Sequence, residues 1–87
     1  MIYQVEIKNS AKSDLRKIKK SNLVDSFQKI ITQLKTNPFA PNQSFEKLTP
    51  PAAGKYSRRL NGQHRVVYAV NKIEQHVTIY SAWSYYN

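Results

Sequence analysis

The stretch from Lys55 to Val70 constrains the fold more than any other part of the sequence. It places an Asn61-Gly62 pair between two segments rich in β-prone residues, KYSRRL and QHRVVYAV. Asn-Gly flanked by such segments is the strongest short-range signal for a β-hairpin. The sequence therefore predicts a hairpin here, with three arginines and a histidine crowded around its turn.

The register of this hairpin determines whether its arginines can act together. With a two-residue turn at Asn61-Gly62, Arg59 and Arg65 lie on opposite faces of the sheet. A three-residue loop beginning at Leu60, with Gly62 left-handed and a bulge, places both arginines on one face. We favour this second register because it gathers apolar side chains on the other face: Tyr56, Val66, Tyr68 and Val70. A solvated basic face with ordinary edge protection is an equally open interpretation of these arginines.

The remaining periodicity predicts an α+β fold. Residues 2–8 alternate as an opening strand. Residues 11–20, with an N-cap at Asn9-Ser10, follow as a first helix, and a second helix starts at Ser21 or Asn22 and ends at Thr36. The second helix has the clearest helical spacing of apolar residues. Residues 44–48 form a short run that could be extended, and strands are expected at 55–60, 63–71 and 75–82. The order β-α-α-β-β-β predicts a twisted antiparallel sheet with the two N-terminal helices packed on one face.

Composition narrows the class of partner. The 87 residues make one small domain (1–87), and 14 Lys plus Arg against 5 Asp plus Glu give a formal charge of +9. This charge predicts binding to nucleic acid or to an anionic membrane surface. No cysteine is present, no His or carboxylate spacing resembles a metal site, and no cofactor is expected. The N-terminus lacks a long apolar core, so we expect a cytoplasmic protein without a membrane span.

Candidate site residues lie on both sides of the hairpin. Glu46 is one of few acids and lies in a basic neighbourhood, where a carboxylate stays deprotonated and can serve as a general base. A charge-balancing loop residue is the simpler alternative. The C-terminal aromatics Trp83, Tyr85 and Tyr86 are either core or interface residues, or stacking platforms for unpaired bases.

These residues together resemble the YoeB/Txe branch of the RelE-like toxins, over the whole length of the chain. The matching pieces are Asn37-Pro38-Phe39, Glu46-Lys47-Leu48, Gly54-Lys55-Tyr56-Ser57-Arg58-Arg59, His64-Arg65-Val66-Val67-Tyr68 and the aromatic C-terminus. The resemblance implies a RelE-like, microbial-RNase-like fold and a toxin of a type II toxin–antitoxin system that cleaves mRNA in the ribosomal A site. It also implies a YefM-like antitoxin that covers the active site, and it allows a homodimer.

The resemblance also implies roles for individual residues. Glu46 matches the general base, and Arg65 matches the arginine that stabilises the transition state. Arg59 matches a further phosphate-binding position. Tyr86 matches a tyrosine that stacks on or orients the RNA. The implied reaction is metal-independent attack of a ribose 2′-OH on the adjacent phosphate, giving a 2′,3′-cyclic phosphate and a 5′-OH. The predicted set of RNA-binding residues is completed by Arg58, Lys47, Lys55, His64 and Trp83.

One position departs from the family pattern. The residue that matches the family's acid histidine is Tyr85, followed by Tyr86 and an additional Asn87. A phenol with a pKa near 10 is protonated at neutral pH, but it releases its proton far less readily than an imidazolium. A natural variant that uses tyrosine, a weakened enzyme and a deliberate inactivating His→Tyr change are all consistent with this sequence.

Two other functions remain open from the sequence. One is a ParE-like inhibitor of gyrase, and the other is an RNA- or ribosome-binding module without catalysis. Clustering of Glu46, Arg59, Arg65 and Tyr85 in one small site favours the nuclease, whereas their dispersal over different faces opposes it.

Overall fold

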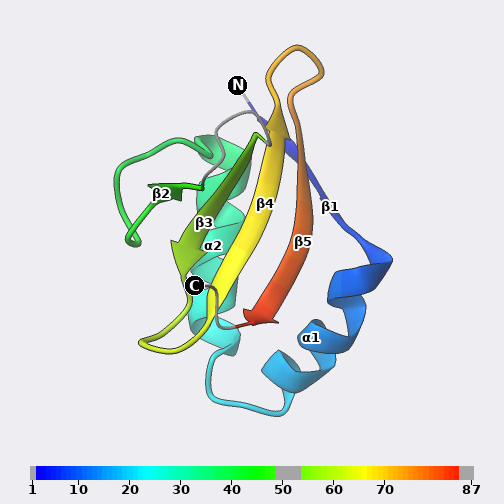
Figure 1. The fold of residues 1–87 in the computed structure, drawn as a ribbon, viewed down its shortest axis with the longest axis vertical. Helices are drawn as coiled ribbons and strands as arrows, with labels where there is room; N and C mark the ends of the chain where they lie inside the picture. Colours follow the sequence, from blue (N-terminus) through cyan, green and yellow to red (C-terminus); the bar gives the residue numbers. More distant parts are fainter. Residues whose placement is uncertain (1, 49–53, 85–87) are drawn as a thin grey trace.

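A five-stranded sheet with the strand order β1-β5-β4-β3-β2 organises the molecule (Figure 1). The computed structural model describes residues 2–48 and 54–84. Its elements are β1 (Gln4–Ile7), α1 (Asn9–Lys19), α2 (Val24–Thr36), β2 (Glu46–Lys47), β3 (Lys55–Arg59), β4 (Arg65–Asn71) and β5 (His76–Ser84). The predicted α+β class is confirmed, and the extended run before the hairpin is a two-residue strand, β2.

The sheet is mixed, which corrects the expectation of a wholly antiparallel one. The antiparallel pairs are β2 with β3, β3 with β4, and β4 with β5. In contrast, β1 pairs parallel with β5, with Val5 opposite Val77. The two helices carry the chain away from β1, and it returns to pair with that strand only at the end. Hydrophobic alternation reports which face a residue occupies but not the relative direction of distant strands.

The hairpin between β3 and β4 has a longer loop than either predicted register. Arg59 lies directly opposite Arg65, so residues 60–64 form the loop and the two arginines share a face, as the favoured register required. The predicted left-handed Gly62 is wrong, because Gly54 is the glycine with a positive φ among the described residues. Instead, Asn61 Oδ1 accepts hydrogen bonds from the backbone N–H groups of Gln63 (2.8 Å) and His64 (2.6 Å). The asparagine side chain therefore closes the turn.

The hydrophobic core lies between the sheet and both helices. α2 runs behind β3 and β4 in Figure 1, and α1 lies beside the end of β5. The buried cluster comprises Ala11, Ile18, Phe27, Ile30, Leu34, Leu60, Val66, Tyr68, Val77, Ile79 and Ala82. The sheet surface opposite α2, called the helix-free face below, carries the alternate residues of β3 and β4, such as Lys55, Ser57, Arg59, Arg65 and Ala69.

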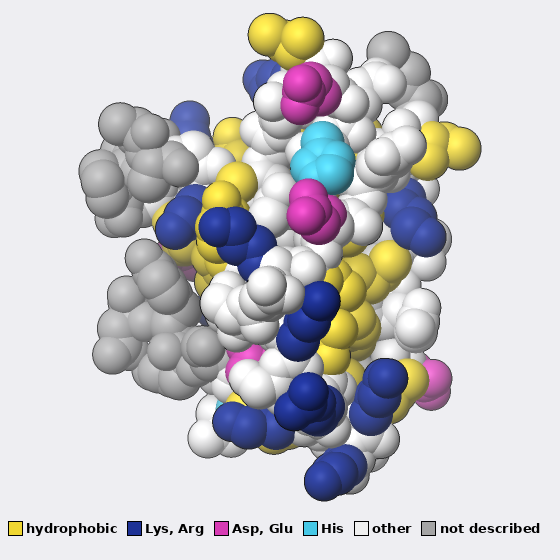
Figure 2. Space-filling view, turned by 90° about the vertical axis from the view of Figure 1, so that its right-hand side faces the viewer, with side chains coloured by type: hydrophobic (Ala, Val, Ile, Leu, Met, Phe, Trp, Pro, Cys, Tyr) yellow, Lys and Arg dark blue, Asp and Glu magenta, His cyan; other side chains and the backbone are white. Residues whose placement is uncertain are grey.

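The outer surface of α1 is strongly basic. Its exposed residues include Lys12, Arg16, Lys17 and Lys19, and Figure 2 shows Lys and Arg side chains gathered over the lower part of this side of the molecule. The isolated acid of this helix, Asp14, points inward and accepts a hydrogen bond from the backbone N–H of Ala82 (3.1 Å). In the described part of the chain, no helix is long and apolar enough to cross a membrane.

Candidate active site

Glu46 and Arg65 meet on the helix-free face of the sheet. Arg65 Nη2 lies 3.4 Å from Glu46 Oε2, and the two side chains are 13% and 61% exposed, respectively. The guanidinium is therefore largely enclosed, whereas the carboxylate remains open to solvent. This combination suits a fixed cationic group beside an accessible base.

Strand pairing explains why these two residues meet. Glu46 of β2 lies opposite Ser57 of β3, and Ser57 lies opposite Val67 of β4, two residues beyond Arg65. Arg65 Nε donates to Ser57 Oγ (2.9 Å), and Arg65 Nη2 donates to the backbone oxygen of Ser44 (2.8 Å). Two neutral acceptors thus fix the orientation of the arginine beside Glu46.

Arg59 supplies a second guanidinium to the same surface. It is exposed, it lies opposite Arg65 in the hairpin, and its backbone N–H donates to the carbonyl of Gln43 (2.7 Å). Glu46, Arg59 and Arg65 therefore lie on one face of three adjacent strands. This face thus carries two guanidinium groups, which attract an anion, and one carboxylate, which can accept a proton.

Arg58 does not belong to this surface, and its predicted role in phosphate binding is wrong. Its side chain is fully buried, because the alternation of β3 turns it to the helix side with Tyr56. Arg58 Nε donates to Tyr68 Oη (3.0 Å), and Nη1 donates to both oxygens of Asn42 (2.7 and 3.0 Å). Arg58 Nη2 donates to the carbonyls of Pro38 (2.9 Å) and Ala40 (3.0 Å).

These contacts give Arg58 a structural role that sequence reasoning missed. Its guanidinium holds the irregular segment 38–43, which leads directly to Ser44 and Glu46. Tyr68 supports the same segment by donating its hydroxyl to the carbonyl of Pro38 (2.7 Å). Burial raises the pKa of Tyr68 to about 12, with the charge of Arg58 opposing the shift. The one available signal in the sequence was that Arg58 shares its strand face with Tyr56.

His64 and Trp83, both predicted to bind RNA, contact each other in the structure. Their rings stack with centroids 4.1 Å apart and an interplanar angle of 19°. Trp83 also packs against the buried core, and His64 Nδ1 is buried without a hydrogen-bond partner among the described residues. The stack occupies one ring face of each residue, so that face of Trp83 packs within the protein. Tyr85 and Tyr86 lie outside the described residues, and their roles stay predictions.

The two predicted lysines occupy different surfaces. Lys47 is exposed and lies opposite Tyr56, which places it on the other side of β2 from Glu46. Lys55 lies on the helix-free face, with Nζ 4.5 Å from the centroid of the Tyr80 ring. Lys55 therefore shares a surface with Glu46 and Arg65, whereas Lys47 does not.

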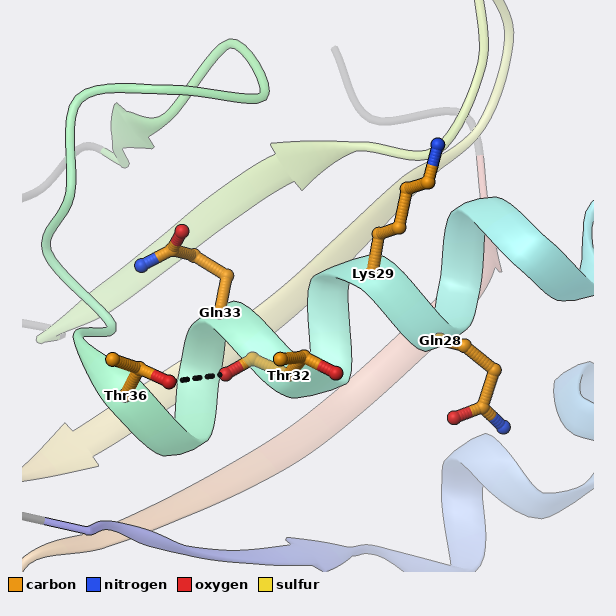
Figure 3. A pocket seen from close by; sticks show the side chains of 5 residues that line it. All are labelled: Gln28, Lys29, Thr32, Gln33 and Thr36. Atoms are coloured by element: carbon orange, nitrogen blue, oxygen red, sulfur yellow. Dashed lines mark hydrogen bonds between the residues drawn. The ribbon is translucent and has the colours of Figure 1, made fainter.

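A hollow on α2 is separate from these residues. It is lined by Gln28, Lys29, Thr32, Gln33 and Thr36, all from one helix (Figure 3). Thr36 Oγ1 donates to the carbonyl of Thr32 (2.9 Å), so the hydroxyl is satisfied within the helix. No predicted site residue lines this hollow, and it does not contribute to the candidate site.

Comparison with known proteins identifies the family and agrees with the fold. A family model described as a YoeB-like toxin of bacterial type II toxin–antitoxin systems matches residues 8–86. A YoeB/ParE toxin from Agrobacterium tumefaciens superposes with a TM-score of 0.84 at 26% identity, covering 95% of this chain and 99% of that one. The YoeB dimer from Staphylococcus aureus superposes with a TM-score of 0.83 at 25% identity, covering 99% and 100%.

A heterotetrameric YoeB–YefM complex from S. aureus is also similar, with a TM-score of 0.79 at 25% identity over 99% of this chain and 100% of that chain. No curated protein sequence matches this chain. The family match spans nearly the whole sequence and agrees with the α+β fold. The chain therefore belongs to the YoeB-like toxins of bacterial type II toxin–antitoxin systems.

Proposed function

We propose that this toxin is an endoribonuclease that cleaves mRNA on the ribosome and thereby inhibits translation. The observation that carries the proposal is the 3.4 Å approach of the accessible Glu46 carboxylate to the enclosed guanidinium of Arg65. A general base that takes the proton of the ribose 2′-OH, and a fixed cation that stabilises charge on the phosphate, both accelerate this cleavage. These are also the roles that the family resemblance assigned to these two residues.

The reaction begins at the ribose 2′-OH. Glu46 accepts its proton, the 2′-oxygen attacks the adjacent phosphorus, and the bond to the 5′-oxygen breaks. The products are a 2′,3′-cyclic phosphate and a 5′-OH, whose oxygen takes a proton as it leaves. Negative charge grows on the phosphoryl oxygens during this step, and Arg65 and Arg59 stabilise it. Loss of one fixed donor of this kind costs about 100- to 1,000-fold in rate.

The C-terminal aromatic residues complete the proposal. Tyr85 protonates the leaving 5′-oxygen, and Tyr86 stacks on or orients the RNA. Because a phenol is a poorer acid than an imidazolium near neutral pH, we expect cleavage to be slower than with histidine at position 85.

We further propose that a YefM-like antitoxin binds this chain and covers the site. The similar S. aureus protein is described in a heterotetrameric YoeB–YefM complex and also as a dimer. The formal charge of +9 favours an acidic partner segment on the same surface that binds RNA. A homodimer is proposed on the same comparison.

Cleavage of mRNA on programmed ribosomes tests the proposed activity. The starting protein is compared with Glu46→Gln and Arg65→Ala, and with Lys29→Ala as a matched control on the distant surface of α2. We expect both site variants to lose at least about 100-fold in rate and the control to retain full rate. Full cleavage by Glu46→Gln and Arg65→Ala would reject the assigned roles.

The same proteins separate the two alternative functions. Inhibition of gyrase supercoiling that survives both site substitutions would favour a ParE-like toxin. Ribosome binding without any mRNA cleavage would favour a non-catalytic binding module.

A further inference from the structure

Two lysines flank one aromatic ring on the helix-free face. Lys8 Nζ lies 4.9 Å from the centroid of the Tyr80 ring, and Lys55 Nζ lies 4.5 Å from the same centroid. Lys8 follows β1, Lys55 begins β3 and Tyr80 belongs to β5, so three separate segments supply the cluster. In Figure 1, β1 and β3 lie on opposite sides of β5.

The sheet register explains how Lys55 reaches Tyr80. Lys55 lies opposite Ala69 of β4, and Ala69 lies opposite Thr78 of β5. The small side chain of Ala69 leaves room for the lysine to extend across β4 to the ring. No special backbone conformation is needed for this contact.

The other side of the cluster is tied to β5 by hydrogen bonds. The backbone N–H of Lys8 donates to the carbonyl of Ile79 (3.0 Å), and Ser10 Oγ donates to the carbonyl of Tyr80 (3.1 Å). The ring is half-buried, so its position is set by the sheet rather than by solvent. The sheet therefore holds the Tyr80 ring, which both ammonium groups approach, at a defined place on the surface.

The positive charge of this cluster is not balanced by the acids of the described chain. Glu6 pairs with His76, Glu46 pairs with Arg65, and Asp14 accepts from Ala82. Within residues 2–48 and 54–84, neither lysine forms a salt bridge. A cation–π contact contributes only about 0.5–1 kcal/mol at an exposed site, and two like charges beside one ring repel each other. A bound anion would remove this repulsion.

The cluster adjoins the candidate active site. Lys55 precedes Ser57 by two residues on the same face of β3, a separation of about 7 Å along a strand. Ser57 is the residue whose hydroxyl accepts from Arg65 Nε. The two positive sites therefore lie on the same face of the sheet, and their residues on β3 are two positions apart.

We propose that Lys8, Tyr80 and Lys55 form a second phosphate-binding site, which holds the RNA backbone next to the cleaved nucleotide. Lysine ammonium groups bind phosphates as point charges and read no base sequence. The ammonium groups lie over the ring, so Tyr80 positions the lysines and does not stack on a base. The proposal rests on the proposed nuclease function for the identity of the ligand. It adds Lys8 to the residues expected to bind RNA, with Tyr80 as a positioning residue.

Binding of an RNA that cannot be cleaved tests this site independently of catalysis. The probe is a short, fluorescently labelled single-stranded oligoribonucleotide with 2′-O-methyl groups, and its affinity is measured by anisotropy at several salt concentrations. Each lost phosphate contact should reduce the slope of log K against log[salt] by about 0.7. We expect Lys8→Ala and Lys55→Ala each to produce this change and the double variant to produce about twice as much.

Three further variants make the result specific. Lys29→Ala removes one positive charge from the outer surface of α2 and should leave the slope unchanged (Figure 3). Tyr80→Leu should weaken RNA binding although it leaves the formal charge unchanged. Tyr80→Phe keeps an aromatic ring and should preserve RNA binding. An equal change in slope for Lys29→Ala, or no change for the lysine pair, would overturn the proposal.

Three additional outcomes separate this site from its alternatives. If the lysine variants lose binding to an acidic poly-glutamate peptide but keep RNA binding, the surface is a protein-binding one and the proposal fails. If the starting protein cleaves no mRNA but the salt slope still depends on Lys8 and Lys55, the nuclease proposal fails and the phosphate site stands. If the starting protein cleaves mRNA but the lysine variants leave the salt slope unchanged, the nuclease proposal stands and the phosphate site is rejected.

Discussion

Arg58 donates a hydrogen bond from its buried Nε to the hydroxyl of Tyr68, at 3.0 Å. The same hydroxyl donates to the carbonyl of Pro38 at 2.7 Å. Tyr68 thus connects the buried arginine to the segment that leads to Ser44 and Glu46. A charged side chain in the core of this small toxin serves to hold an irregular loop beside the candidate active site.

Removing the Tyr68 hydroxyl should destabilise the fold. Tyr68→Phe leaves the Arg58 Nε–H without its acceptor, and a buried unsatisfied polar group costs about 1–3 kcal/mol. The measurement is the free energy of unfolding in urea, with Tyr80→Phe as a control on the helix-free face. Equal stability of Tyr68→Phe and the starting protein would show that the hydroxyl does not support the loop.

The raised pKa of Tyr68 predicts a loss of stability at alkaline pH. The folded protein holds this proton up to a pKa of about 12, whereas the unfolded chain releases it near 10. The contribution is complete below pH 10 and disappears as the pH rises from 10 to 12, with a maximum of about 3 kcal/mol. Urea unfolding across this range should show a steeper decline for the starting protein than for Tyr68→Phe, and parallel curves would contradict the prediction.

Ser57 should matter for cleavage because it orients Arg65. Ser57→Ala removes the acceptor of the Arg65 Nε hydrogen bond, and we expect the rate on programmed ribosomes to fall about tenfold, equivalent to about 1.4 kcal/mol. Ser13→Ala, on the exposed surface of α1, is the matched control. A normal rate in Ser57→Ala would mean that the hydroxyl does not fix the guanidinium.

The acid at position 85 should limit the rate. Tyr85→His supplies a group that titrates near neutral pH, so we expect cleavage to become at least about tenfold faster. Tyr85→Phe, which has no proton to give, should be slower than the starting protein. Equal or lower activity of Tyr85→His would count against the proposed proton donor.

Local patterns predicted the elements of this fold well. The helical spacing of apolar residues placed the second helix at 22–36, and the structure has α2 at Val24–Thr36. The alternation in the hairpin correctly placed Arg59 and Arg65 on one face, although the loop is closed by Asn61 and not by a left-handed Gly62. Periodicity is a local property, and it is sufficient to locate a helix and to assign side chains to a face of the sheet.

Properties that depend on distant segments were not predictable in the same way. The parallel pairing of β1 with β5 joins the two ends of the chain, and no local pattern specifies it. The burial of Arg58 depends on several carbonyls converging from an irregular loop, whereas its residue type suggested a phosphate ligand. The contact of Lys55 with Tyr80 likewise depends on the register across three strands.

The chemistry of the cut ends of mRNA tests the central claim most directly. After cleavage on programmed ribosomes, the upstream fragment should end in a 2′,3′-cyclic phosphate, and a single 2′-deoxy substitution at the cleaved nucleotide should abolish the reaction. Both results follow from attack by the 2′-oxygen with Glu46 as base. Fragments ending in a 3′-OH, or undiminished cleavage of the 2′-deoxy substrate, would contradict the mechanism built on Glu46 and Arg65.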